Sequence, residues 1–143
     1  MPFDFSELDR SKAAAVYLWQ RAEILMAQRE WDAALNDTTD AIRRASRDEQ
    51  GYVLRAWILA TADDAKFRDG AKAVAAARAA CELSYWYGGE SLACLAAAHA
   101  ECGHFEEAVK WQTEALEHAF PEQKDEFARQ LAVYESGKPL RAK

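Results

Sequence analysis

The sequence predicts an all-α fold on three observations: its composition, its alanine runs, and a recurring unit of two helices. The chain has 143 residues, of which 50% are hydrophobic and 29% charged. This is the composition of a globular protein, and the length suits one domain with a real core. Only three prolines and six glycines interrupt the chain. Alanine, which has the highest helix propensity and lets helices approach closely, recurs in runs such as Lys72–Ala80.

Three segments share one pattern, at residues 17–42, 52–83 and 91–116. Each has an apolar helix with alanines, a short break with charged residues, and a second helix with small residues seven positions apart. Seven residues make about two helical turns, so both small residues of a pair face the same neighbour. An aromatic residue lies three positions before the first alanine in the outer two segments. The pairs are Ala34/Ala41, Ala73/Ala80 and Ala108/Ala115, and the aromatic residues are Trp31 and Phe105.

The pattern predicts seven helices, and local signals mark several of their ends. Asp69 is a predicted N-cap. Pro121 is placed to begin the last helix, whose apolar stripe consists of Phe127, Leu131 and Tyr134. Gly137 is placed to end it. The predicted ranges are 11–28, 31–46, 49–62, 69–84, 89–102, 105–119 and 122–136.

The recurring unit resembles the tetratricopeptide repeat (TPR), about 34 residues folded as two antiparallel helices. The third segment matches at Leu92, Leu95, Ala96, Gly103, Phe105, Ala108 and Ala115, with Pro121 just beyond its end. The first matches at Leu18, Ala22, Leu25, Trp31, Ala34 and Ala41, and its Arg21 and Asp37 resemble a common subtype. The second carries about five extra residues near Ala60–Gly70 and is similar to a bacterial variant with an insertion there.

The resemblance implies a right-handed α-solenoid of three TPR-like antiparallel hairpins and a C-terminal capping helix. It implies an N-terminal extension at 1–12, a single TPR domain at 13–136 and a C-terminal tail at 137–143. Within the domain, the repeats span about 15–47, 49–84 and 89–121, followed by the cap helix at 122–136.

In TPR folds the first helices of the hairpins line a concave groove, so the resemblance also implies a non-catalytic scaffold that binds a partner peptide or helix. The Lys, Arg and Asn of the two-carboxylate clamp of some TPRs are absent from these positions. Two tryptophans, a methionine and small residues instead favour an apolar or amphipathic segment with some basic residues. The groove positions are Val16, Trp19, Glu23, Met26, Gln50, Val53, Trp57, Thr61, Glu90, Ala93, Ala97 and Glu101.

Two alternatives to an open groove stay open. Neighbouring helices, or the segment at residues 2–5, would cover Trp19 and Trp57. Self-association, or a fixed place in a larger assembly, would fill the groove or an end face of the domain. The aromatic cluster Tyr85–Tyr87 is interpreted as packing between repeats.

A metal- or thiol-based sensor or enzyme is a third hypothesis, built on Cys94, His99, Cys102 and His104. On one helix His99 lies about 140° around the axis from Cys94, and Cys102 about 80°. Metal ligands on a helix more often lie at i and i+4 or in CxxC-like spacing. We therefore interpret these side chains as packing residues, and we expect no catalytic residue, metal or cofactor.

Charge and hydropathy argue against nucleic-acid binding and against membrane insertion. The formal net charge is −6, whereas nucleic-acid binding depends on Lys and Arg that neutralise phosphates. No apolar run approaches the roughly 18–20 residues of a membrane span, so we expect no membrane insertion. The N-terminus carries acids where a signal peptide is basic, and the three cysteines have no framework spacing. We therefore expect a cytoplasmic protein with reduced thiols.

Overall fold

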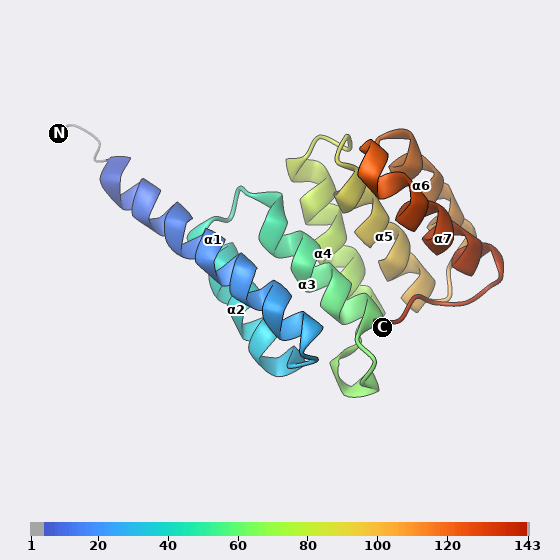
Figure 1. The fold of residues 1–143 in the computed structure, drawn as a ribbon, viewed down its shortest axis with the longest axis horizontal. Coiled ribbons are helices and arrows are strands. Elements are labelled where there is room, and N and C mark those ends of the chain that lie inside the picture. Colours follow the sequence, from blue (N-terminus) through green and yellow to red (C-terminus); the bar gives the residue numbers. More distant parts are fainter. Residues whose placement is uncertain (1–4, 143) are drawn as a thin grey trace.

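Seven α-helices make up the fold of residues 5–142, the part of the chain that the computed structural model describes (Figure 1). Two short 3₁₀ turns join them, η1 (Ala65–Phe67) and η2 (Pro121–Gln123). No strand occurs in this part of the chain, and none of its helices is long and apolar enough to cross a membrane. The α-helices are α1 (Phe5–Ala27), α2 (Trp31–Arg44), α3 (Glu49–Thr61), α4 (Gly70–Leu83), α5 (Gly89–Glu101), α6 (Phe105–Glu117) and α7 (Lys124–Glu135).

Consecutive helices pack in pairs: α1 with α2, α3 with α4, and α5 with α6. The pairs lie side by side because α3 contacts α2 on one side and α5 on the other, and α7 packs against α6 (Figure 1). The sequence predicts that both alanines of each pair face a neighbouring helix, and this is confirmed. All six are fully buried: Ala34, Ala41, Ala73, Ala80, Ala108 and Ala115.

Helix α5 lies at the centre of the core. Every residue from Ser91 to Ala100 is buried, because α3, α4 and α6 all pack against this one helix. A helix that is apolar on all sides belongs in such a position. Helix α4 begins very close to the C-terminal end of α5. A Cβ atom at Gly70 would lie 2.7 Å from the Cys102 Sγ atom. Only glycine permits that approach without a shift of the neighbouring atoms.

Local signals predict most helix ends. The Asp69 carboxylate accepts a hydrogen bond from the Lys72 backbone N–H at 3.0 Å, which confirms the N-cap. Gly137 follows α7 with a φ of 75°, a conformation that glycine adopts readily. Residues 62–69, within the region where the second segment is expected to carry extra residues, form the loop that contains η1.

Two predicted boundaries are corrected. Helix α1 begins at Phe5 rather than at residue 11; residues 1–4 lie outside the part of the chain that the structure describes. Glu7 in the first turn favours this early start, because an acid there complements the helix dipole. The turn after Pro121 is 3₁₀ rather than α-helical, and the Gln123 side chain accepts a hydrogen bond from the Phe120 N–H.

Arg21 and Asp37, which the sequence singles out, form a bidentate ion pair between α1 and α2. The Arg21 Nε and Nη2 atoms donate to the two Asp37 carboxylate oxygens at 2.7 and 2.6 Å. Asp37 is buried, with 5% of its surface exposed. The carboxylate holds the pKa of Arg21 above its usual range, mainly through this hydrogen bond. The pair therefore satisfies a buried charge at the first helix–helix contact.

We predict that Arg21→Met lowers the unfolding midpoint clearly, because it leaves the buried Asp37 carboxylate without its cation. Arg43→Met is the matched control, since Arg43 pairs with Asp40 at the protein surface and exposed pairs contribute little. Thermal unfolding followed by circular dichroism measures both variants. Equal midpoints for the two variants would contradict this role of the pair.

Candidate functional site

A groove opens between α1, α3 and α5 on one side and α7 with the residues after it on the other. Its hollow has a volume of about 440 Å³. Aromatic and aliphatic side chains line it together with carboxylates and amides. We call this hollow the groove, and it is lined by Met26, Trp57, Thr61, Glu90, Glu122, Gln123, Glu126, Phe127, Gln130, Leu140, Arg141 and Ala142.

Four of the predicted groove residues line it: Met26, Trp57, Thr61 and Glu90. A fifth, Glu101, lies at the end of α5 and pairs with Arg141. These residues come from α1, α3 and α5, the first helices of the three pairs. The fold therefore brings together side chains that are up to 75 positions apart in the sequence.

Three predicted groove residues are corrected. Val53, Ala93 and Ala97 are no more than 2% exposed and belong to the core. The reason is that α3 and α5 pack directly against each other, so small residues on these helices face a neighbouring helix rather than an open surface. They offer no contact to a partner in this structure.

The remaining predicted positions lie near the contact between α1 and α3 and do not line the hollow. Glu23 is exposed and accepts a hydrogen bond from the Gln50 side chain at 3.4 Å. Val16 and Trp19 are half-buried. A Cβ atom at Gly51 of α3 would lie 3.5 Å from the Trp19 Nε1 atom, and Lys12 lies over the Trp19 ring. Neighbouring residues thus cover much of Trp19, whereas Trp57 lines the groove.

Trp57 and Glu90 form a polar contact within the lining of the groove. The Trp57 Nε1–H group donates to a Glu90 carboxylate oxygen at 3.0 Å. Burial raises the pKa of the Glu90 carboxyl above its usual value, the hydrogen bond from Trp57 lowers it, and the negative Glu23 raises it. The indole ring is thereby held in one orientation with its apolar surface beside the hollow.

The charges that line the groove are nearly all negative. Glu90, Glu122 and Glu126 line it, and Arg141 is the single cation among its lining residues. Arg141 belongs to the C-terminal tail rather than to the helices. The helical part of the groove therefore suits a partner that is apolar and basic.

Sequence reasoning misses the α7 and tail side of the groove. Phe127 is predicted only as part of a cap stripe, and no role is predicted for Leu140 or Arg141. The signal that could reveal them is the basic tail, with Lys138, Arg141 and Lys143, in an acidic chain. The path of that tail depends on where α7 ends in space, which local sequence patterns do not encode.

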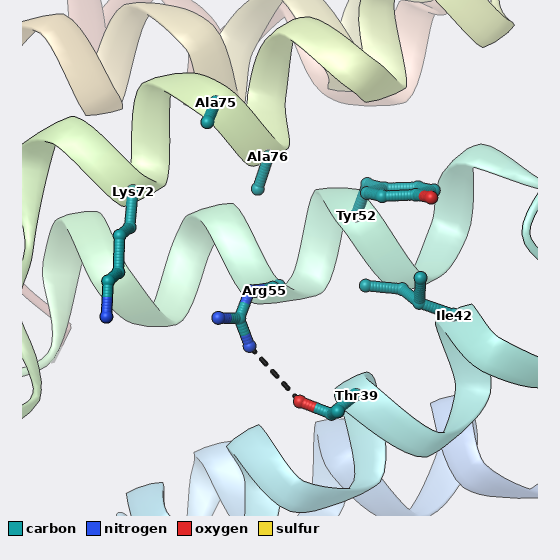
Figure 2. A pocket seen from close by; sticks show the side chains of 7 residues that line it. All are labelled: Thr39, Ile42, Tyr52, Arg55, Lys72, Ala75 and Ala76. Atoms are coloured by element: carbon teal, nitrogen blue, oxygen red, sulfur yellow. Dashed lines mark hydrogen bonds between the residues drawn. The ribbon is translucent and has the colours of Figure 1, made fainter.

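A second hollow, of about 470 Å³, lies among α2, α3 and α4 (Figure 2). Arg55 points toward Thr39 across it and donates a hydrogen bond to the Thr39 hydroxyl at 3.2 Å. Ile42, Ala75 and Ala76 supply apolar surface beside it, and Tyr52 and Lys72 complete the lining. It contains none of the predicted site residues.

The cluster Tyr85–Tyr87 is corrected in part. Trp86 packs against Trp111, with ring centroids 5.4 Å apart, as the interpretation of packing between repeats requires. Tyr85 and Tyr87 are instead 81% and 72% exposed. The reason is local: Tyr85 and Trp86 both have positive φ, so the chain turns sharply and only one of the three rings points inward.

The cysteines and histidines do not form a ligand cluster. In residues 5–142 no three side chains of His, Cys, Asp or Glu are arranged to hold a metal ion. Burial raises the pKa of the Cys94 and Cys102 thiols, and that of Cys81 to about 12. Burial also lowers the pKa of His99, whose ring lies 5.9 Å from that of His104. Raised thiol pKa values disfavour the thiolate that nucleophilic or redox chemistry needs.

We predict that Glu90→Gln raises the thermal unfolding midpoint at neutral pH. The folded-state pKa of Glu90 is raised, so the folded protein binds this proton more tightly than the unfolded chain. The stability that protonation supplies is complete below the unfolded-state pKa and is lost as pH rises through the folded-state pKa. Glutamine is uncharged and keeps an oxygen that accepts the Trp57 hydrogen bond.

The difference in midpoint between Glu90→Gln and the wild type should therefore shrink as pH falls from neutral. Thermal unfolding followed by circular dichroism over this pH range measures it. Glu135→Gln serves as the control, since Glu135 is exposed and lies outside the groove. A difference that is independent of pH would show that the charge of Glu90 does not cause it.

Comparison with known proteins does not identify a family for this chain. The chain matches no protein-family model, and no curated protein matches it significantly. The function is therefore inferred from the groove and from the helix packing around it.

Proposed function

We propose that this chain is a non-catalytic scaffold whose groove binds an apolar or amphipathic segment, with some basic residues, of another protein. The observation that carries the proposal is the position of Trp57, half-buried at the edge of a groove whose helical residues supply carboxylates but no cation. Tryptophan is enriched among the residues that contribute most to protein interfaces.

We also propose that the three helix pairs are TPR-like repeats in a right-handed solenoid. The six paired alanines are fully buried, and Trp31 is 4% exposed at the start of the second helix of the first pair. The ion pair between Arg21 and Asp37 links the two helices of that pair. These contacts support the resemblance because they involve the positions on which it rests.

The groove suits a short segment rather than a flat protein surface. Met26 and Trp57, both half-buried, offer apolar contact from two different helices, whereas Phe127 lines the groove but is only 3% exposed. Glu90 and Glu122 offer acceptors to lysine or arginine, whereas Glu126 already pairs with Arg129. Because these groups stand on packed helices, little conformational entropy is lost when a segment binds, and a few anchors supply the affinity.

We predict that Trp57→Ala weakens partner binding at least tenfold, a loss of about 1.4 kcal/mol or more, in the range of interface anchor residues. The measurement is a pull-down from the native source with immobilised wild type and variant, followed by titration with the captured protein. Because the partner segment is basic, binding should also weaken as salt is raised.

Tyr85→Ala is the matched control, since it removes an exposed aromatic ring outside the groove. Circular dichroism checks that the helical content and cooperative unfolding of both variants are retained. Unchanged affinity in a folded Trp57→Ala variant would refute the proposed function. Loss of cooperative unfolding would assign Trp57 to the core instead, which also counts against it.

Self-association is a second candidate, favoured by the exposed aromatic side chains. Tyr85, Tyr87 and Phe120 are 81%, 72% and 66% exposed. The Tyr87 ring packs edge-on against His118, with centroids 5.2 Å apart, and Phe120 follows two residues later. Exposed aromatic groups of this size often mark contacts between proteins.

If these rings form a contact between two copies, the sedimentation coefficient should rise with protein concentration, and Tyr87→Ser should abolish the rise. Sedimentation velocity over a wide concentration range measures this. Trp57→Ala is the matched control, because Trp57 lies in the groove. A coefficient that does not depend on concentration excludes self-association under those conditions.

A further inference from the structure

The chain after α7 does not leave the protein but returns to it. After the turn at Gly137, the non-helical residues run back past the end of α5 toward the end of α3 (Figure 1). Within the C-terminal tail expected at 137–143, we call residues 138–142 the tail. Leu140 packs against the core, and Leu140, Arg141 and Ala142 all line the groove.

The tail binds to groups that a helix leaves available at its C-terminal end. The Ala142 N–H group donates to the Thr61 carbonyl at 2.8 Å, in the last turn of α3. Arg141 donates to the Glu101 carboxylate at 2.7 Å and to the Ala60 carbonyl at 3.5 Å. The last carbonyls of a helix lack partners within it, and its negative dipole end attracts a cation.

The tail has the same chemistry as the partner that the groove favours. It carries an apolar side chain, Leu140, followed directly by a cation, Arg141. That cation pairs with the Glu101 carboxylate beside the groove, and the other lining residues of the groove supply no cation. One segment of the chain thus shows how a segment of this kind is held, through an apolar contact, a charge pair and a backbone hydrogen bond.

We infer that the tail is an internal ligand held at the C-terminal ends of α3 and α5, where it forms one wall of the groove, and that this place also accepts short basic segments in which an apolar residue is followed by arginine. This inference rests on the proposed function and adds the pattern of the partner segment. It also implies competition: a partner segment binds by displacing the tail.

The tail can leave without exposing an unpaired buried charge. Glu101 is 15% exposed in its side chain and also pairs with Arg68 at 3.2 Å, so its carboxylate keeps a cation when Arg141 departs. Leu140 and Arg141 are only half-buried. Segments with few buried contacts open at low free-energy cost compared with the core.

Competition has a measurable consequence. A tail that stays docked at the ends of α3 and α5 about nine-tenths of the time raises the apparent dissociation constant of a competing segment about tenfold. The probe is a fluorescently labelled peptide with the sequence of residues 136–143, SGKPLRAK. Its binding to the full-length chain is measured by fluorescence anisotropy.

We predict that the peptide binds the Arg141→Ala variant about tenfold more tightly than the wild type, because the variant tail no longer holds the site. Lys138→Ala is the matched control. It removes one cation from the tail, but Lys138 is exposed and makes none of the contacts with α3 or α5 described above. A peptide with alanine in place of its arginine should not bind. Adding Glu101→Gln to Arg141→Ala should abolish the gain in affinity.

Amide hydrogen exchange, measured by NMR, gives an independent readout of the tail itself. The Ala142 amide should be protected in the wild type and in Lys138→Ala, and should exchange rapidly in Arg141→Ala. Rapid exchange in the wild type, or equal peptide affinity for wild type and Arg141→Ala, overturns the inference.

The two proposals can fail separately. If Ala142 is unprotected but partner capture still depends on Trp57, the internal ligand is refuted and the proposed function stands. If Ala142 is protected but no captured protein depends on Trp57, the proposed function fails, and with it the inferred partner pattern.

Discussion

The close approach of helices around α5 is the constraint on which the rest of the structure depends. Ten consecutive residues of this helix, Ser91 to Ala100, are buried, because three other helices pack against it. Small side chains make this possible: six of the ten are alanine or cysteine with at most 1% exposure. Larger residues would force the helices apart and cost stability through strained packing. The positions of alanine in the sequence therefore determine where helices can approach one another closely.

This packing decides where a partner can bind. Because α3 and α5 pack against each other, their small residues are buried in the core. Ala93 and Ala97, for example, are not accessible to a partner. What remains accessible is the edge of these helices near Trp57 and Glu90, and their C-terminal ends near Thr61 and Glu101. Helix α7 and the tail cover the far side, which turns an open face into a groove with two walls.

The charges of the groove favour a basic partner segment. Its helical walls carry carboxylates, and the cation among its lining residues comes from the tail. Burial carries a cost for the charged Glu90 carboxylate, and the negative Glu23 adds to that cost, as the raised pKa of Glu90 shows. A basic segment lowers that cost by supplying counter-charge. The same argument explains why the tail binds there and why a similar segment of another protein suits the site.

Local patterns in the sequence suffice to predict the helices and their order. Alanine spacing, the Asp69 cap and the glycine after α7 are local signals, so each of the seven helices could be predicted from neighbouring residues. The contact between Arg21 and Asp37 also lies within one helix pair, where sequence separation is short. Which groove positions are exposed, and the return of the tail to the ends of α3 and α5, follow instead from how the helices pack. Exposure of Ala93 depends on how closely α3 approaches α5, and the contact of Arg141 with Glu101 joins residues 40 positions apart. Both depend on the summed geometry of several helices, which no local pattern of side chains specifies.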